Sequence, residues 1–457
     1  MSDDKSVSRR DFLGRAVGAA GMGCAAARAF ARGRGSADRP NIIFIHTDQQ
    51  YGGMLSAHGE PFVSTPNMDR LAAEGVSFRE SYSANPVCCP ARAAWYTGRP
   101  STENGVVMND RWPLMRDMPD LGQWMGSHGY RSVYAGKWHV TGRPLRGSFD
   151  VITFGHGIGE HGDAAVARAA EGFLRSYDGD EPFFLNLGFL QPHDICYWLF
   201  RNTLPKDECP YELVDEELPP LPDSWQYDER EPEFFRQHWR EGGAAKHLGN
   251  WKPWQWRYYR WAYARHVEMV DAHIGRVLDS LEDSRFADNT LVVFTSDHGD
   301  GHGRHHMFSK MYFYEEAALV PMIVRFPGRT GEGIQDTDHL VSGLDVAPTL
   351  CDYAGIEAPP KARGLSLRPL VEGRRAPWRE FLVSEAHRIG RMVRTPEYKL
   401  ITYEGSPTEQ LFDMREDRLE QLNLAAEGTH DGVVADLRKR LREWDGHLEH
   451  PELTPIE

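Results

Sequence analysis

The chain has 457 residues, of which 40% are hydrophobic and 26% are charged, and its 52 basic and 67 acidic side chains give a formal net charge of -15. This is the composition of a globular protein with one large domain, or one large and one small domain. The acidic balance excludes broad nucleic-acid binding, which needs a basic surface. Any anionic ligand must therefore be captured by a local group of basic side chains.

The first 31 residues resemble a twin-arginine export signal. Arg9 and Arg10 precede a stretch of small apolar residues at 16–27, and residues 29–31 (Ala-Phe-Ala) resemble a cleavage site. The stretch is shorter than the roughly 18 apolar residues of a membrane span. We therefore expect export by the twin-arginine machinery and a periplasmic or secreted mature protein. The alternative is a solvated basic start of a cytosolic chain.

Four apolar runs predict strands that are buried on both faces, at residues 41–46, 131–135, 182–189 and 290–295. Thr65 and Pro66 predict the start of a helix. A second helical pattern covers 259–281, where apolar residues recur at spacings of three and four. The alternation of strands and helices predicts an α/β fold with a mostly parallel sheet sandwiched by helices.

Residues 194–255 interrupt this pattern. They are rich in proline and acidic residues, as long functional or disordered loops are, but their tryptophans argue against disorder: Trp198, Trp225, Trp239, Trp251 and Trp254. The rings of this region either pack in the core and anchor the loop, or stack against a sugar. Cys196 and Cys209 are close enough in sequence to pair in an oxidising compartment.

The pattern changes again from about residue 375. Short strand-like runs at 392–393, 398–403 and 410–413 precede a helical pattern at 433–444. They predict a small C-terminal antiparallel sheet plus helix. We therefore divide the chain into the export signal (1–31), a large α/β domain (38–374) and an α+β subdomain (375–457).

Polar clusters follow each of the four predicted strands: Asp48-Gln49, Gly136-Lys137-Trp138-His139, Pro192-His193 and Asp297-His298-Gly299-Asp300. Ligands of parallel sheets bind at the carboxyl ends of the strands. We therefore expect the four clusters to converge, although a single Asp after a strand is more often a capped turn.

A fifth cluster is Cys88-Cys89-Pro90-Ala91-Arg92, which is followed by Thr97-Gly98-Arg99. Adjacent cysteines bridge each other only with strain. The run resembles the C-x-P-x-R signature of the sulfatases and the Thr-Gly-Arg segment that follows it, and the four strand-end clusters match sulfatase motifs in the same order. The resemblance covers the chain from Pro40 to the C-terminal helix. It implies an alkaline-phosphatase-like α/β fold, with 38–374 as the catalytic domain, and the hydrolysis of sulfate esters.

The resemblance also implies that Cys88, and not Cys89, is oxidised to formylglycine by a formylglycine-generating or sulfatase-maturating enzyme. The hydrate of this aldehyde has two hydroxyl groups on one carbon. One attacks the sulfur atom, and the other then loses its proton so that the aldehyde reforms and sulfate leaves. Pro90, near the start of a helix, is expected to present residue 88 to the helix dipole.

A metal site follows from the same resemblance. Asp48, Asp297 and the modified Cys88 supply oxygen ligands, which suit calcium or magnesium. The resemblance places the other two ligands at Gln49 and His298, where the commonest pattern has Asp and Asn. His298 widens the choice towards manganese or zinc, but calcium is the metal that we expect, acting as a Lewis acid.

The predicted site also contains residues that bind the sulfate and residues that transfer protons. Lys137 and Lys310 resemble the two lysines that bind sulfate in the family, and with Arg92 they form the local basic pocket. His139 resembles the base for the second hydroxyl group, and His193 resembles the acid facing the leaving oxygen, a task that Lys310 can share.

The sequence leaves three functions open. The first is a sulfatase acting on a sulfated small molecule or carbohydrate. The second is a phosphonate monoester or phosphodiester hydrolase, since related enzymes share the nucleophile and carry Gln and Asp-His at the metal. The third is an inactive sulfate-binding protein, whose sign would be the loss of Cys88, Lys137 or His139, and all three are present.

Overall fold

The computed structural model describes residues 39–155, 157–200, 216–228, 230–241, 251–453 and 455. The predicted export signal and Cys209 lie outside these residues. The Cys196–Cys209 pairing and the predicted domain boundaries therefore stay predictions.

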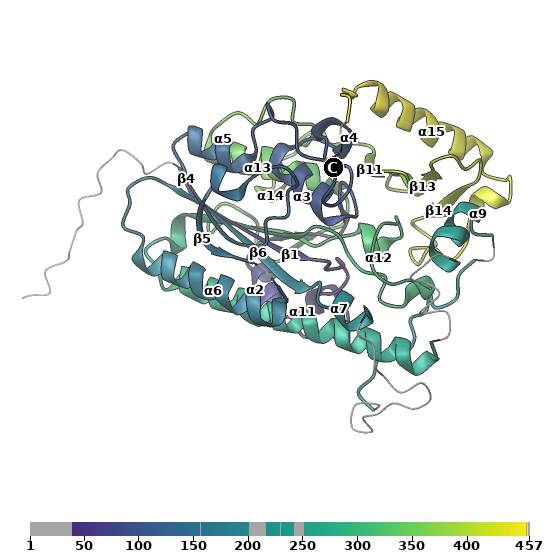
Figure 1. The fold of residues 1–457 in the computed structure, drawn as a ribbon, viewed down its shortest axis with the longest axis horizontal. Coiled ribbons are helices and arrows are strands. Elements are labelled where there is room, and N and C mark those ends of the chain that lie inside the picture. Colours follow the sequence, from purple (N-terminus) through teal and green to yellow (C-terminus); the bar gives the residue numbers. More distant parts are fainter. Residues whose placement is uncertain are drawn as a thin grey trace, which may run out of the picture. The chain divides into compact units, whose positions relative to one another are not determined.

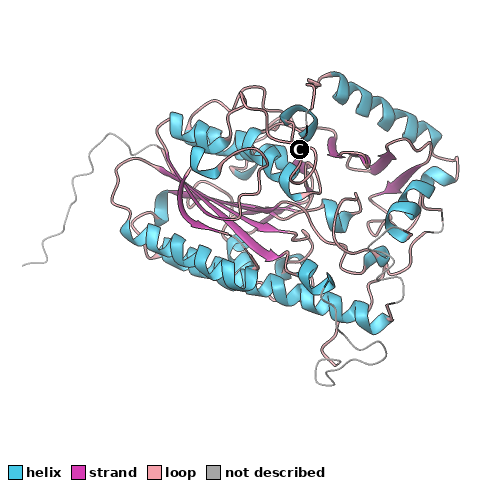
Figure 2. Ribbon diagram, viewed as in Figure 1, coloured by secondary structure: helices cyan, strands magenta, loops and turns pink. Residues whose placement is uncertain are grey.

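An eight-stranded sheet forms the centre of the described chain (Figures 1 and 2). Its strands, in spatial order, are β5 (Asp150–Phe154), β4 (Arg131–Gly136), β6 (Phe183–Pro192), β1 (Asn41–Asp48), β7 (Thr290–Ser296), β8 (Met322–Arg325), β2 (Val76–Phe78) and β9 (Ile334–Asp336). Strands β4, β6, β1 and β7 are neighbours and run parallel, whereas β8 is antiparallel to β7 and β2. The predicted mostly parallel sheet is confirmed.

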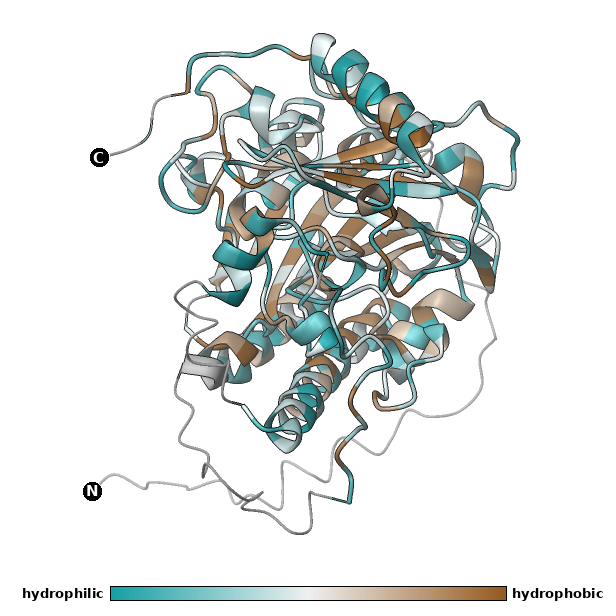
Figure 3. Ribbon diagram, turned by 90° about the vertical axis from the view of Figure 1, so that its right-hand side faces the viewer, coloured by the Kyte–Doolittle hydropathy of each residue, from teal (hydrophilic) through white to brown (hydrophobic). Residues whose placement is uncertain are grey.

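Helices cover both faces of this sheet, because its central strands are apolar on both sides. In β1, Ile42 and Phe44 pack in one core cluster, while Ile43 and Ile45 pack in another on the opposite face. The first face carries α3 (Cys88–Thr97), α5 (Leu121–Ser127) and α13 (Val346–Ala354). The second carries α2 (Pro66–Ala73), α6 (Gly159–Ser176) and α11 (Pro253–Glu282) (Figure 1). Figure 3 shows the strands between these layers as the most hydrophobic ribbon.

Shorter elements connect these layers. The helices are α4 (Ser101–Asn104), α7 (Ile195–Phe200), α9 (Glu233–Phe235), α12 (Glu315–Ala318) and α14 (Arg368–Val371), and β3 (Ser81–Tyr82) pairs in parallel with β10 (Val341–Ser342). No helix of the described residues is both long enough and apolar enough to cross a membrane.

The C-terminal part is a four-stranded antiparallel sheet with a helix, as predicted. The strands follow in chain order: β11 (Leu382–Ala386), β12 (Gly390–Arg394), β13 (Tyr398–Tyr403) and β14 (Glu409–Asp413). Helix α15 (Asp431–Gly446) packs on the sheet through Val434 and Leu437. Strand β11 is absent from the sequence prediction, because Ser384 and Glu385 interrupt its apolar residues.

Candidate active site

The carboxyl ends of four parallel strands meet at one edge of the sheet. Asp48 ends β1, Lys137 follows β4, His193 follows β6 and Asp297 follows β7. Helix α3 starts at the same place with Cys88. The structure thus brings the five clusters together.

A glycine allows the chain to turn where Lys137 leaves its strand. Gly136 has a φ of 106°, and a Cβ atom there would lie 2.0 Å from the carbonyl oxygen of Gly188 on the neighbouring strand. Only glycine fits this close approach without strain. The turn directs Lys137 towards Asp48, with 2.7 Å between Nζ and Oδ2.

Cys88 lies at the centre of the site and is 1% exposed. Its Sγ atom accepts a hydrogen bond from Nζ of Lys310 at 2.8 Å and lies 3.2 Å from Nε2 of His298. Oδ1 of Asp48 is 3.9 Å away. The first residue of α3 is therefore surrounded by an ammonium group, an imidazole ring and a carboxylate.

Arg92 orients the two carboxylates of the site. Its Nη2 donates to Oδ2 of Asp48 at 2.8 Å, and its Nε donates to Oδ2 of Asp297 at 3.0 Å. A third bond runs from Nη1 to the backbone oxygen of Lys137 at 2.9 Å. Because the guanidinium is fully buried behind the carboxylates, the basic groups left to meet an anion are Lys137 and Lys310.

The site stabilises negative charge. Burial and the Asp48 carboxylate raise the pKa of the Cys88 thiol, but Lys310, Lys137 and His298 together hold this pKa well below its usual value. Burial also raises the pKa of Asp48, but Lys137, His193, Arg92 and Lys310 together outweigh burial and hold this pKa well below its usual value, so that the carboxyl stays ionised. An anionic nucleophile and an anionic ligand are both favoured in such an environment.

Asp297 fixes the backbone on both sides of the site. Its Oδ1 accepts the N–H groups of Gln49 and His298, each at 2.9 Å. Gln49 has a φ of 71°, in the left-handed region, and such strain is common where a side chain is held for function. Its Oε1 accepts from Nζ of Lys310 at 3.1 Å, and its Nε2 donates to Oδ2 of Asp300 at 2.7 Å.

The predicted metal ligands form a compact donor set. One ligand atom from each of Asp48, Cys88, Asp297 and His298 lies within 4.8 Å of the others, and all four residues are buried. Two carboxylates and an imidazole beside the amide oxygen of Gln49 fit a divalent cation.

The two predicted acid–base histidines lie at the accessible side of the site. Nε2 of His193 is 4.0 Å from Oδ1 of Asp48, and burial lowers the pKa of His193 to about 3. Nε2 of His139 is 3.2 Å from Oδ1 of Asp110. Burial opposes protonation of His139, but hydrogen bonds with the sulfur atoms of Cys88 and Cys89 raise its pKa to about 10.

Family models and relatives agree with this geometry. The sulfatase family model matches residues 40–356. The chain belongs to the sulfatase family. A second model, for the C-terminal part of N-sulphoglucosamine sulphohydrolase, matches residues 303–446. The predicted family and the predicted activity, sulfate ester hydrolysis, are confirmed.

Three relatives illustrate the likeness. The Delta 4,5-hexuronate-2-O-sulfatase of Bacteroides thetaiotaomicron is 30% identical over 435 residues, which cover 89% of each chain. The structure of a 2-O GAG sulfatase matches with a TM-score of 0.77 at 28% identity, over 89% of this chain and 92% of that one. A phosphonate monoester hydrolase of Agrobacterium radiobacter has the same TM-score at 23% identity, over 92% and 99% of the chains, which is a likeness of fold. The fold of this sulfatase is alkaline-phosphatase-like, as predicted.

Three residues of the candidate site have no role in the sequence prediction, although Asp300 belongs to one of its clusters. Asp300 holds the amide of Gln49 and accepts from the Tyr259 hydroxyl at 2.7 Å. Asn109 accepts the backbone N–H of Cys89 at 2.9 Å, and Asp110 contacts His139. Asp300 belongs to a motif that the sequence shows, whereas no motif surrounds Asn109 and Asp110.

Most of the other aromatic side chains near the site, and the Cys196 thiol, contact neighbouring side chains. Rings of Trp225 and Trp251 both contact Trp256 of α11, which supports the core interpretation of this tryptophan-rich region. Sγ of Cys196 lies 3.1 Å from Nε2 of Gln49. His302, which the predicted site omits, stacks on Tyr263 at 5.7 Å.

Proposed function

We propose that this sulfatase hydrolyses the sulfate ester of a sulfated carbohydrate with a formylglycine made from Cys88. The observation that carries the proposal is the environment of Cys88: a buried first residue of α3, contacted by Lys310 and His298 and facing the Asp48 carboxylate. The carbohydrate rests on the names of relatives, among them an N-acetylglucosamine-6-O-sulfatase of Bacteroides thetaiotaomicron. The formylglycine would supply the attacking hydroxyl group as its hydrate.

Lys137 and Lys310 are the residues that bind the sulfate oxygens in this proposal. Both ammonium groups lie beside residue 88. Nζ of Lys137 contacts Asp48, whose carboxylate faces Cys88, and Nζ of Lys310 contacts the Sγ atom of Cys88 directly. Arg92 is bound to the carboxylates of Asp48 and Asp297 behind the pocket, and Lys137 and Lys310 are the positive groups that face the anion. These two ammonium groups support capture of sulfate by a chain of net charge -15.

The proton transfers are assigned to His139, His193 and Lys310. His139 contacts residue 88, and the hydrogen bond with the Cys88 sulfur that helps to raise its pKa is lost when residue 88 is formylglycine, so that His139 can accept the proton of the hydroxyl group that does not attack. Burial keeps His193 neutral, with a pKa of about 3, while the anionic neighbours of Lys310 raise the pKa of that ammonium against the effect of burial. Lys310 therefore holds the proton, and His193 and Lys310 share the contact with the leaving oxygen.

Asp48, Gln49, Asp297, His298 and the modified residue 88 would hold the metal ion. We propose calcium, with magnesium and manganese as alternatives, because most of the donors are oxygen atoms. When bound, the ion supplies Lewis-acid chemistry, which lowers the pKa of the nucleophilic hydroxyl group and neutralises charge on the sulfate.

The proposal includes maturation and export. A formylglycine-generating or sulfatase-maturating enzyme converts Cys88, and the twin-arginine machinery exports the chain to the periplasm or the medium. The support is the sequence of residues 1–31, with Arg9-Arg10 before an apolar stretch.

Phosphodiester or phosphonate monoester hydrolysis is the second candidate, and the neutral ligands Gln49 and His298 favour it. Turnover of 4-nitrophenyl sulfate and of bis(4-nitrophenyl) phosphate by matured protein separates the two. We expect the higher kcat/KM for the sulfate, followed by turnover in a panel of sulfated glycans. A higher kcat/KM for the phosphodiester would contradict the proposal, and Cys88→Ala is the control for contaminating activity.

A further inference from the structure

A second group of possible metal ligands lies beside the predicted sulfate site. It consists of Cys89, Asp110 and His139, and one ligand atom from each of these residues lies within 4.8 Å of the others. Cys89 is the second residue of α3, Asp110 lies in the loop between α4 and α5, and His139 follows β4. Three separate segments therefore bring a thiol, a carboxylate and an imidazole to one point.

This donor set differs from that of the predicted calcium site. A thiolate and an imidazole are ligands of zinc, whereas calcium binds oxygen atoms. Nε2 of His139 and Oδ1 of Asp110 are 3.2 Å apart. Two such ligands of a tetrahedral zinc ion are about 3.3 Å apart, at bond lengths of about 2.0 Å. The geometry of this pair is therefore already close to that of a zinc site.

The third ligand atom lies near enough to share the same ion. Because the three atoms lie within 4.8 Å of one another, a point between them is within about 2.8 Å of each, and zinc bonds to nitrogen, oxygen and sulfur are about 2.0–2.3 Å long. Small shifts of the side chains therefore bring all three atoms into bonding distance of one ion.

Backbone hydrogen bonds hold the three ligand segments together. The N–H of Cys89 donates to Oδ1 of Asn109 at 2.9 Å, which joins the start of α3 to the loop of Asp110. The N–H of Asp110 donates to Oγ1 of Thr141 at 3.2 Å, which joins this loop to the segment of His139. Ligands that are positioned before the ion binds lose less affinity to ordering.

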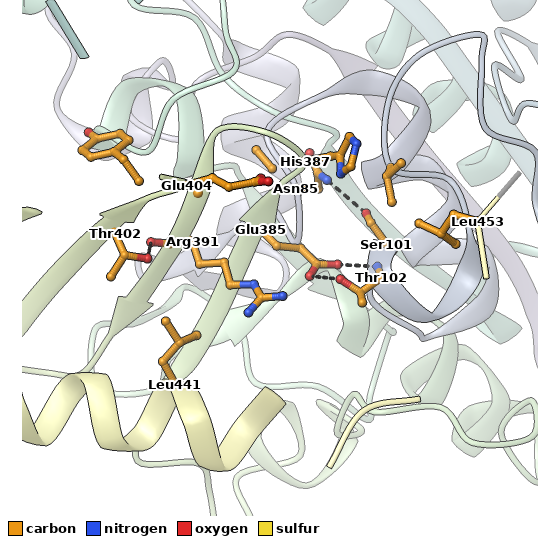
Figure 4. A pocket seen from close by; sticks show the side chains of 14 residues that line it. Asn85, Ser101, Thr102, Glu385, His387, Arg391, Thr402, Glu404, Leu441 and Leu453 are labelled. Carbon is orange, nitrogen blue, oxygen red and sulfur yellow. Dashed lines mark hydrogen bonds between the residues drawn. The ribbon is translucent and has the colours of Figure 1, made fainter. Parts of the chain in front are cut away.

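The C-terminal part of the chain fixes the loop of Asp110 on both sides. Before the loop, the backbone N–H and the hydroxyl of Thr102 donate to the Glu385 carboxylate of β11 at 2.7 and 2.6 Å, as Figure 4 shows. At the end of the loop, the Trp112 ring contacts the His387 ring at 5.3 Å between centroids. These contacts limit the motion of the loop that carries the Asp110 carboxylate.

The exposure of the three residues gives an ion a path to the thiol. The Asp110 side chain is 76% exposed and the His139 side chain is 26% exposed, whereas Cys89 is buried. The Cys89 sulfur forms a hydrogen bond with His139, so an ion that replaces this hydrogen bond contacts both residues. The thiol proton leaves to solvent when the ion binds. The fourth position of the ion stays open on the solvent side for a water molecule.

We propose that Cys89, Asp110 and His139 form a zinc site that inhibits the enzyme. The inhibitory effect rests on the proposed function, in which His139 accepts the proton of the second hydroxyl group. Zinc takes the nitrogen lone pair that would accept this proton, so that the sulfated enzyme forms but cannot release sulfate. The Cys89 thiol supplies the preference for zinc over calcium, since calcium does not favour sulfur ligands.

Cobalt absorption detects the site without relying on turnover. Co²⁺ replaces zinc as a coloured probe, because its bond with a thiolate gives a near-ultraviolet charge-transfer band. It is added to the full matured chain, in which residue 88 has lost its sulfur atom, with calcium in excess. We expect this band in the parent, its removal by Zn²⁺, and no band in Cys89→Ser. Zinc affinity should be at least about tenfold weaker in both Cys89→Ser and Asp110→Asn.

The matched control is Cys196→Ser, which removes a thiol that lies 3.1 Å from Nε2 of Gln49. This variant should keep the band. Absence of the band in the parent, its persistence in Cys89→Ser or its loss in Cys196→Ser would overturn the zinc site. Thermal unfolding checks that Cys89→Ser is folded. Asp110→Asn keeps the test decisive if it is not, because an exposed carboxylate is replaced without loss of packing.

Kinetics then test the inhibition. With 4-nitrophenyl sulfate as the substrate, zinc should lower kcat of the parent, and sulfated enzyme should accumulate. Cys89→Ser, compared with its own rate without zinc, should need at least about tenfold more zinc for the same inhibition. Equal sensitivity of the parent and Cys89→Ser would overturn the inhibitory role. Failure of the parent to hydrolyse any sulfate would instead contradict the proposed function, and the cobalt spectra would still decide the zinc site.

Discussion

This protein contains two buried lysines whose charged neighbours differ. Lys137 contacts Asp48 at 2.7 Å in the candidate active site, where the neighbouring atoms include the Cys88 thiol. Lys399 of β13 contacts Glu315 at 2.8 Å and Glu420 at 2.7 Å, and it is fully buried. The first cluster has surplus positive charge beside a reactive atom, whereas the second pairs one lysine with two carboxylates.

The comparison shows that buried, perturbed charges do not by themselves mark an active site. The pKa of each lysine is raised by its carboxylate partners against the effect of burial. Lys399 joins the C-terminal sheet to α12 and has no nucleophile or open face, so its cluster stabilises the fold. The catalytic cluster is distinguished by Cys88 and by a surplus of charge that only a ligand can balance.

The largest expected effect separates the two cysteines of the motif. Cys88→Ala should reduce kcat for 4-nitrophenyl sulfate by more than about a thousandfold, because the nucleophile is lost. Cys89→Ser should keep most of the activity, since the Cys89 side chain takes no part in the bonds made or broken and a serine hydroxyl can still contact His139. Equal losses in the two variants, measured on protein with unchanged thermal unfolding, would point to a thiol mechanism.

The next effect is on stability. Lys399→Met should lower the free energy of unfolding by about 3–5 kcal/mol, because Glu315 and Glu420 are left buried without a cation. Turnover per folded molecule should stay near that of the parent. Lys439→Met, at an exposed lysine of α15, is the control and should change stability by less than about 0.5 kcal/mol in urea unfolding. A loss below about 1 kcal/mol in Lys399→Met would show that the ion pairs of Lys399 with Glu315 and Glu420 contribute little to stability.

Lys137→Ala should show the reverse behaviour, a loss of activity rather than a loss of stability. We expect kcat/KM to fall by an amount equivalent to about 2–4 kcal/mol of transition-state stabilisation, the usual effect of removing one preorganised donor. Steady-state kinetics with 4-nitrophenyl sulfate measure it. An unchanged kcat/KM would remove Lys137 from the sulfate pocket.

The last expected effect is a pH dependence of stability. Burial raises the pKa of Glu420 to about 8, with Lys399 opposing and Glu315 reinforcing the shift, while an unfolded glutamate titrates near about 4.3. Between these values the folded state binds the additional proton, so this group's contribution to the free energy of unfolding decreases as pH rises. In Glu420→Gln that contribution is absent. The free energy of unfolding, measured with urea between about pH 5 and 8, should therefore change less with pH than it does in the parent. Identical profiles would contradict the assignment.

Much of the fold was predictable because its central strands are buried on both faces. The apolar runs at 41–46 and 290–295 correspond to β1 and β7, which lie side by side with their polar ends together. Strand β2 and the edge strand β9 have only three residues each, so their patterns were too short to predict. Helix α11 begins at Pro253, before the predicted 259, because tryptophans at its start hide the apolar period.

The parts of the site that are formed by residues close together in the sequence were predictable. The strand-end clusters and the motif at Cys88 place the predicted groups correctly in space, but the burial of Arg92 behind Asp48 and Asp297 needs the tertiary structure. Asp110 lies in a loop without a motif, and only folding brings it to His139.

The central claim is that residue 88 acts as formylglycine, and the mass of the tryptic peptide 80–92 tests it most directly. Protein is prepared with graded amounts of a maturating enzyme, and the aldehyde fraction at residue 88 is compared with turnover of 4-nitrophenyl sulfate. We predict that turnover rises in proportion to that fraction, with no aldehyde at residue 89. Full activity in protein that contains only the Cys88 thiol would contradict the account.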